Sequence, residues 1–439
     1  MTPDTPGHHE AALLVEARLG RPPQDVLEAA VVLEAWAGVP AQAAMEAAQR
    51  IMPGVPAEAQ RSVGRLPRAR NREGALLDGV AFIITVIAIA TWAAPLSSNV
   101  GVSVVERGLW LALPLTLGLQ WILSSRFLDR PHGVAQLADH RGMLVLGGVT
   151  VLLVPSLVLG VGGLLAGMLT VTWTGGTLLI RRGWPAAYVL AILLATQAMV
   201  AGLDALAVVG ATAAATTLIV VFALRPASSP VRRSLGRWER ATGAGAIGVC
   251  IGLMLILDRT VSWTDGALPA LALLPSTVAG FWAGYHLRHL EQAIPGAVLG
   301  ASVADAHTGP LGWPPVRVLL GSLGRFVLVC GTSSAALLWL TPWLGDSARG
   351  AGVLAGFGLV ALASMLVALL ESMGHGRWAL TTVAAAAALE AATQLAGLHP
   401  FSGTGLVAGG ALAVALVLPA VTALLWRPAS TLATALWIP

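Results

Sequence analysis

The sequence lacks lysine altogether and contains few charged residues, tyrosines or cysteines. All 26 of its basic residues are arginines, and charged residues make up 11% of the 439 residues, against about 25% in soluble domains. Hydrophobic residues make up 56%, and the mean hydropathy is +0.77. These values exclude a soluble globular domain, a disordered chain and a coiled coil. What remains is a polytopic membrane protein built from apolar segments.

The scarcity of cysteine and the placement of arginine exclude further classes. Cys250 and Cys330 both lie in apolar stretches, so neither a disulfide framework nor a cysteine-based metal site is expected. The arginines are scattered over loops rather than clustered with aromatic residues, so no nucleic-acid partner is expected. The sequence has no phosphate-binding loop, zinc-protease motif or nucleophile elbow. We therefore expect no enzyme activity, no catalytic residue, no metal and no cofactor.

From Leu76 onward the chain contains about 12 apolar segments, each long enough to cross ~30 Å of hydrocarbon as a helix. The predicted fold class is all-α: a membrane protein of two six-helix lobes with a small cytoplasmic helical segment before them. The break at Gly160–Gly163 decides whether the number of spans is even. The predicted spans are 76–97, 108–125, 143–160, 162–180, 186–203, 205–224, 242–258, 267–286, 317–341, 350–371, 378–397 and 404–426.

The arginines also predict the orientation in the lipid bilayer. With the N-terminus in the cytoplasm, most arginines fall in inner loops, and only Arg107, Arg259 and Arg349 fall in outer loops. Cytoplasmic loops of membrane proteins carry an excess of Arg and Lys. We therefore expect a multi-pass protein of the cytoplasmic membrane with both termini inside.

The charged loop 225–241 separates a first lobe, 76–224, from a second lobe, 242–426, and the tail 427–439 follows. The second span of each lobe contains Leu-Pro with a Trp seven residues after the Pro, at Pro114 and at Pro275. These matches favour an internal duplication. An even number of spans in each half makes the repeats parallel, a design that suits alternating access at a cavity between two lobes.

Residues 1–75 are predicted to form a separate cytoplasmic segment. Three short helices are expected, at 10–19, from Val26 after the N-cap candidate Asp25, and from Pro40 to about Met52. An arginine-rich linker follows. Because so short a bundle buries little surface, we expect it to dock on the membrane part or on a cytoplasmic partner such as a glycan synthase.

The turn between the tenth and eleventh spans carries a resemblance to a known superfamily. The run 353–378, VLAGFGLVALASMLVALLESMGHGRW, ends in the small-residue turn 370–378, and an alanine-rich span and a glycine-rich span follow. Glycines allow two helices to join through such a tight turn. The pattern resembles the multidrug/oligosaccharidyl-lipid/polysaccharide (MOP) exporter superfamily of MATE-like transporters and Wzx-type flippases. The resemblance covers residues 280–426 directly, and it extends to residues 76–224 only through the internal repeat.

The resemblance implies a cavity lined by spans 1, 2, 7 and 8. In this sequence those spans offer polar residues but no arginine well inside the bilayer. This favours a neutral or cationic glycan, or a Pel-type exporter that works beside a synthase, over a pyrophosphate-linked substrate. The polar residues are Asp78, Thr85, Thr91, Thr116, Gln120, Ser276, Thr277, Tyr285 and His286.

Two ionisable residues within the spans are the leading site candidates. Glu390 lies near the middle of span 11 with Gln394 one turn later, and a carboxyl group at such a depth is a candidate for coupling to H⁺ or Na⁺. Arg325 lies about 12 Å past Arg317 along span 9. It could hold an anionic substrate group or an acidic partner, or its side chain could extend to the inner surface.

The other pathway candidates are weaker. Asp78 is also typical of a helix start at the head-group level, and Gln120 of a hydrogen bond between helices. Tyr285 and His286 lie at the inner end of span 8. Asp258 and Arg259 are interpreted as charges of an outer loop.

Three functions remain open. The first is a flippase or exporter of a polysaccharide or lipid-linked saccharide that works by alternating access. The second is a major-facilitator transporter of small molecules, because the loop 137–142 (Leu-Ala-Asp-His-Arg-Gly) looks like that family's loop motif. The third is a membrane subunit that anchors or regulates a glycan synthase without transporting anything itself.

Overall fold

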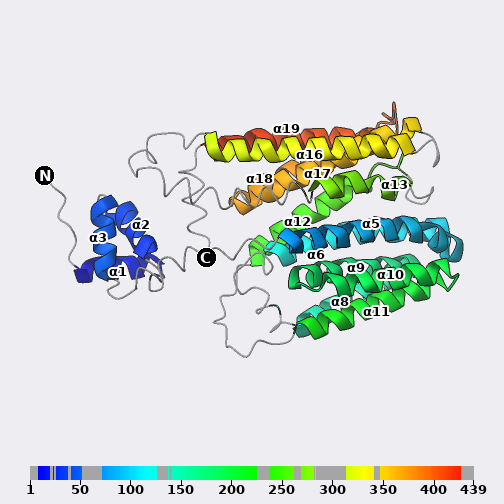
Figure 1. Ribbon diagram of the computed structural model, residues 1–439, viewed down its shortest axis with the longest axis horizontal. Helices are drawn as coiled ribbons and strands as arrows, with labels where there is room; N and C mark the ends of the chain where they lie inside the picture. Colours follow the sequence, from blue (N-terminus) through cyan, green and yellow to red (C-terminus); the bar gives the residue numbers. More distant parts are fainter. Residues whose placement is uncertain are drawn as a thin grey trace. The chain divides into compact units, whose positions relative to one another are not determined.

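The structure is a computed structural model of the whole chain, and it describes part of it. The described residues are 8–19, 23, 26–37, 41–51, 72–125, 137, 141–224, 238–261, 268–280, 282, 313–340 and 347–426. Within these ranges the regular structure is helical and contains no strand. The chain divides into two compact units, of which one holds α1–α3 and the other holds α5–α19 (Figure 1).

The N-terminal unit has the three helices that the sequence predicts. They are α1 (His8–Leu19), α2 (Val26–Ala37) and α3 (Ala41–Ile51). A small core of its own joins them, because Val15, Ala29 and Leu33 are fully buried together with alanines of α3. The N-cap candidate Asp25 lies outside the described residues.

The second unit contains long apolar helices. Its first half consists of α5 (Arg72–Val100), α6 (Val102–Leu123), α8 (Arg141–Leu159), α9 (Val161–Arg182), α10 (Pro185–Val200) and α11 (Ala205–Ala223). Its second half consists of α12 (Trp238–Met254), α13 (Leu268–Leu271), α16 (Trp313–Leu340), α17 (Ser347–Ser372), α18 (Gly376–Leu395) and α19 (Thr404–Trp426). Each predicted span except 267–286 coincides with one of these helices. Of span 267–286 the structure describes 268–280 and 282.

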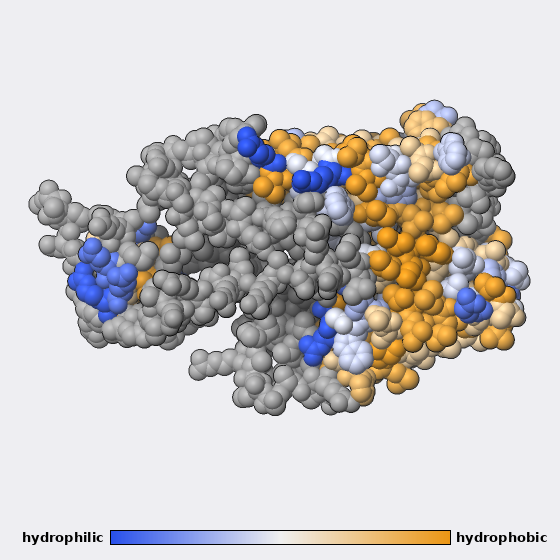
Figure 2. All heavy atoms as spheres, viewed as in Figure 1, coloured by the Kyte–Doolittle hydropathy of each residue, from blue (hydrophilic) through white to orange (hydrophobic). Residues whose placement is uncertain are grey.

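Eight of the described helices are long and apolar enough to cross a membrane, and α10 and part of α12 form shorter apolar helices. Apolar side chains also cover much of the visible surface of this unit (Figure 2). In α8, for example, Leu157 is 84% exposed, and most residues of the apolar span Gly142–Leu159 are exposed or half-buried. Such a surface is suited to lipid rather than water. The chain is therefore a polytopic helical membrane protein, while the number of 12 spans and the position of the termini stay predictions.

The predicted break near Gly160–Gly163 is present. Helix α8 ends at Leu159, Gly160 has a φ of +59°, and α9 begins at Val161. The two helices then lie against each other with glycines at the contact. A Cβ atom on Gly163 would lie 1.8 Å from the carbonyl oxygen of Pro155, and one on Gly167 would lie 2.6 Å from that of Val151.

The two halves of this unit use the same helix pairs. In the first half α5 contacts α10, and α9 contacts α8 and α11. In the second half α12 contacts α18, and α17 contacts α16 and α19. In chain order, α5, α8, α9, α10 and α11 of the first half correspond to α12, α16, α17, α18 and α19 of the second half. The pairs of the first half are therefore equivalent to the pairs of the second half. The shared pairing favours the duplication that the sequence suggests.

The halves meet along α6 and α12, where the sequence analysis expected a polar route. The contact is tight: a Cβ atom on Gly248 would lie 2.3 Å from the carbonyl oxygen of Leu117, and one on Gly252 would lie 2.5 Å from Cα of Pro114. Glycines let the two backbones approach closely. Over their described residues, helices α6 and α12 therefore form a close-packed seam rather than the walls of an open route.

Two of the polar groups that were expected to line this route bond within their own helices. The hydroxyl of Thr91 donates to the carbonyl oxygen of Ala88, and that of Ser276 donates to that of Leu273. A hydroxyl that bonds to the preceding turn presents little polarity to its surroundings. Near the end of the seam, the guanidinium carbon of Arg259 lies 5.6 Å from the ring centroid of Trp110 and links the two halves.

Asp204 caps the N-terminus of α11, and this cap makes stability depend on pH. Hydrogen bonds from the backbone N–H of Ala207 and from the Asn99 amide lower the pKa of Asp204 below its ordinary value. The folded-state pKa is thus below the unfolded one. The contribution of Asp204 to the stability of the fold is therefore present above about pH 4, and it is lost as the pH falls through the folded-state pKa.

We therefore expect Asp204→Ala to remove part of the loss of stability that the parent protein shows in acid. Thermal melting of both proteins in detergent between pH 2 and pH 6, a range set by the Asp pKa of about 4, measures this difference. Equal acid sensitivity of the two proteins would contradict the expectation.

Candidate functional site

Glu390 has an unusual environment for a carboxyl group. It lies in α18 about 7.5 Å before the last residue of that helix, so it is nearer to the helix end than the sequence analysis placed it. Its side chain is fully buried. Neither carboxyl oxygen has a hydrogen-bond partner of normal geometry among the described residues. A carboxylate in such a place is unstable unless it takes up a proton or pairs with a cation.

Asp258 lies beside Glu390, and both of its carboxyl oxygens accept hydrogen bonds. It follows α12, and only 2% of its surface is exposed. Its Oδ2 accepts hydrogen bonds from the backbone N–H groups of Gly405 (2.8 Å) and Leu406 (3.3 Å), in the first turn of α19. Its Oδ1 accepts from the backbone N–H of Thr260 at 3.0 Å and from the Thr260 hydroxyl. The Asp258 carboxyl group thus caps the N-terminus of α19, the positive end of that helix's dipole.

This burial corrects the sequence interpretation of Asp258 as a charge of an outer loop. The residues that bury it lie far along the chain, at the start of α19, and no local pattern in the sequence marks them. The hydroxyl and backbone of Thr260 reinforce the same contact, because they bond to Gly403 and Ser402. Sequence reasoning therefore had no signal for Asp258 as a site residue.

Three polar side chains converge on Gly405. A Cβ atom built on Gly405 would lie 3.0 Å from Nε2 of Gln394, 3.0 Å from Cγ of Glu390 and 3.1 Å from Oδ2 of Asp258. The missing side chain of Gly405 leaves room for all three. Nε2 of Gln394 also lacks a hydrogen-bond partner among the described residues. We call Asp258, Glu390 and Gln394 the carboxyl cluster.

The carboxyl cluster combines two acidic groups and one amide in a buried place. The Asp258 and Glu390 carboxyl groups are close enough to interact electrostatically, and two like charges there oppose each other. Asp258 accepts four hydrogen bonds, whereas neither oxygen of Glu390 accepts one of normal geometry among the described residues. The described residues contain no group of three His, Cys, Asp or Glu side chains that could hold a metal ion. Oxygen ligands of this kind suit a proton or an alkali cation rather than a transition metal.

The other predicted candidates do not join the cluster. Gln120 donates hydrogen bonds to Thr177 (2.7 Å) and to the carbonyl oxygen of Trp173 (3.4 Å), so it joins α6 to α9. Asp78 is 4% exposed in the first part of α5. Arg325 is exposed on α16. Tyr285 and His286 lie outside the described residues.

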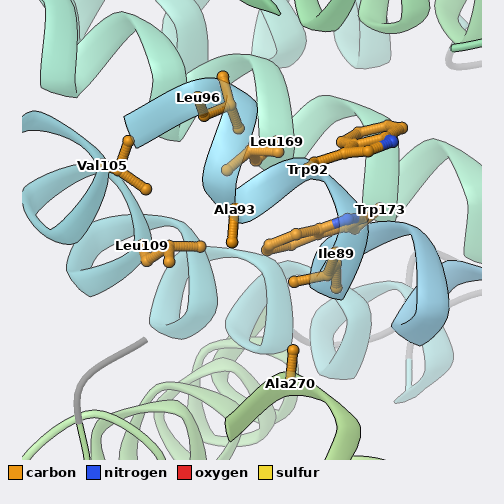
Figure 3. Close-up of a pocket in the computed structure, with 9 residues that line it drawn as sticks. All are labelled: Ile89, Trp92, Ala93, Leu96, Val105, Leu109, Leu169, Trp173 and Ala270. Atoms are coloured by element: carbon orange, nitrogen blue, oxygen red, sulfur yellow. The ribbon is translucent and has the colours of Figure 1, made fainter. Parts of the chain in front are cut away.

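A pocket lies between the first half and α13 of the second half (Figure 3). The space that it encloses is small, about 20 Å³, roughly what one water molecule needs. Ala270 of α13 faces side chains of α5, α6 and α9 across it. The indole N–H of Trp92 donates to the Thr196 hydroxyl at 3.0 Å, which fixes the ring beside the pocket. The lining residues are Ile89, Trp92, Ala93, Leu96, Val105, Leu109, Leu169, Trp173 and Ala270. The pocket therefore suits an apolar group.

The chain is similar to one solved structure, described as the outward-facing conformation of a multidrug resistance MATE family transporter of the MOP superfamily. The similarity covers 82% of this chain and 94% of that one, with a TM-score of 0.48 and 13% sequence identity. No protein-family model and no curated protein matches the sequence.

Proposed function

We propose that the protein is a secondary transporter that exports a lipid-linked saccharide or a polysaccharide across the cytoplasmic membrane. Export is driven by a gradient of protons or sodium ions that act at the carboxyl cluster. The observation that carries this proposal is the full burial of Glu390, whose carboxyl oxygens accept no hydrogen bond of normal geometry among the described residues. A group that must lose its charge or gain a cation is suited to couple ion binding to a change of conformation.

The position of the cluster supports a route from ion binding to helix movement. Asp258 lies four residues after the end of α12, and Glu390 belongs to α18, which contacts α12. Helix α12 in turn forms the seam with α6 of the other half. Neutralising Glu390 removes its repulsion from Asp258 and so changes the forces at the end of α12. We propose that this change opens or closes the seam.

The pocket supports a substrate with an apolar part. Its lining consists of alkyl and indole groups from both halves, so it changes shape when the halves move. The chain of a lipid-linked saccharide matches the apolar chemistry of this lining and could enter it if the halves move apart, whereas a bare polysaccharide has no apolar part to match it. We therefore favour the lipid-linked substrate.

Transport into liposomes tests the proposal. The purified protein is reconstituted with a fluorescent polyprenyl-linked saccharide, and its movement is followed with and without an imposed proton or sodium gradient. Glu390→Gln removes the charge with little change in shape. We expect it to lower gradient-driven transport by at least about tenfold, equivalent to ~1.4 kcal/mol. Glu371→Gln, at the end of α17, is the matched control and should transport normally.

Stability measurements separate a coupling role from a structural one. If Glu390 stored unfavourable energy for coupling, Glu390→Gln should melt at a higher temperature than the parent while transporting less. If Glu390 were structural, the variant should melt at a lower temperature. Comparing sodium chloride with potassium chloride, and pH 6 with pH 8, identifies the ion. Normal gradient-driven transport by Glu390→Gln would refute the proposal.

A second function is favoured by one observation. Helices α1–α3 form a unit with its own buried core, as expected of a docking module. The protein would then anchor a glycan synthase through residues 1–75. Deleting residues 1–71 should release a cytoplasmic partner and leave gradient-driven transport unchanged if both functions exist. If the deletion releases the partner and the full-length protein shows no transport, the anchoring function alone is favoured.

A further inference from the structure

Helix α16 carries an arginine on a face that should meet lipid. Only 11% of its apolar span Val316–Leu340 is buried, and among the described helices it contacts α17 and α19. The exposed side chains on its surface are mainly apolar, as shown by Val327 (59% exposed), Leu328 (65%) and Trp339 (79%). Arg325 is exposed among them. Strongly hydrophilic residues interrupt the apolar surface in the region of α16 (Figure 2).

The Arg325 side chain extends back toward the start of α16. Its Nη1 atom lies 3.7 Å from the position of a Cβ on Gly321, one turn earlier. Side chains of a helix point toward its N-terminus in this way. Arg317 is exposed two turns before Arg325, about 12 Å along the helix. The extended guanidinium group of Arg325 therefore comes closer to Arg317 than the helix rise alone suggests.

Small residues leave space next to these arginines. A Cβ atom on Gly324 would meet no atom within 4 Å, and one on Gly321 would meet only Arg325. A group can therefore approach the backbone of α16 between the two guanidinium groups. The orientation expected from the arginine distribution places this end of α16 at the cytoplasmic leaflet, where anionic lipids are concentrated.

We propose that this face of α16 binds the phosphate of an anionic phospholipid between Arg317 and Arg325. Guanidinium groups bind phosphate oxygens in pairs, and an arginine at this depth is costly without an anion. The acyl chains of the lipid lie along Leu328 and Trp339, which share the helix face of Arg317 and Arg325. A lipid is favoured over a protein partner because the phosphate and the chains match the arginines and the apolar residues beyond them. The proposal does not depend on the transport function.

Lipid binding to the purified protein tests this site. The protein in neutral detergent receives phosphatidylglycerol or phosphatidylcholine, and bound lipid is counted by native mass spectrometry while melting is recorded. Phosphatidylglycerol should bind and raise the melting temperature more than phosphatidylcholine. Arg325→Ala should weaken phosphatidylglycerol binding about tenfold, and Arg325→Lys should weaken it less. Arg377→Ala, an exposed arginine at the start of α18, is the matched control and should bind normally.

Further measurements distinguish a lipid from the other ligands that could bind at this face of α16. Inorganic phosphate and glycerol phosphate should not reproduce the stabilisation, because they lack acyl chains. Stabilisation by either one would show a free anion site and overturn the lipid assignment. Equal binding of phosphatidylglycerol to the parent and to Arg325→Ala would also overturn it. A third result would also overturn it: the parent protein has the mass of a dimer and Arg325→Ala has the mass of a monomer. In that case a second copy of the protein, and not a lipid, would occupy this face.

Discussion

Asp258→Ala is expected to lower the free energy of unfolding by about 3–5 kcal/mol. The substitution removes the acceptor of the backbone N–H groups of Gly405, Leu406 and Thr260. Leaving a buried N–H group unsatisfied costs about 1–3 kcal/mol. The loss also removes the negative charge that faces the start of α19. The connection between the end of α12 and the start of α19 should therefore loosen.

Unfolding of the purified protein by heat or by a denaturing detergent measures this effect. Asp258→Asn keeps one oxygen acceptor and should lose about half as much stability. Asp204→Ala is the matched control, because Asp204 also accepts from a helix N-terminus but is exposed. It should change the melting temperature far less. Similar losses in Asp258→Ala and Asp204→Ala would show that burial of Asp258 adds nothing.

The positions of the helices could be predicted from the sequence because they depend on local properties. A run of apolar residues of sufficient length fixes each helix, and the break at Gly160 follows from glycine's tolerance of a positive φ. The three helices of the N-terminal unit were also predicted from local signals, namely short apolar patterns between prolines and glycines.

The site was predicted only in part, because it depends on contacts between distant residues. Glu390 and Gln394 were recognised as polar residues in an apolar span, and the structure brings them together. Asp258 was missed, because its burial depends on Gly405 and Leu406, well over 100 residues later. The apolar seam of α6 and α12 was missed for the same reason. Glycines such as Gly248 and Gly252 are common in apolar spans, and only the fold shows which ones touch another helix.

Gly163→Ala is expected to be the most disruptive small substitution in the first half. The added Cβ would lie 1.8 Å from the carbonyl oxygen of Pro155, an atom of the α8 backbone that cannot rotate away. Helices α8 and α9 must then move apart along the contact that also includes Gly167. Overpacking a core usually costs about 1–3 kcal/mol, and a backbone clash of this kind should cost about 3 kcal/mol or more.

Gly147→Ala on α8 is the matched control, because a Cβ there meets no atom within 4 Å. Alanine favours a helix over glycine by up to about 1 kcal/mol, so Gly147→Ala should leave stability unchanged or raise it. The two substitutions make the same chemical change, but only Gly163→Ala should lower the melting temperature. A similar shift in both would mean that α8 does not lie against α9 at Gly163. In that case the polypeptide would continue past Gly160 without turning back, and every span after it would face the opposite side of the membrane.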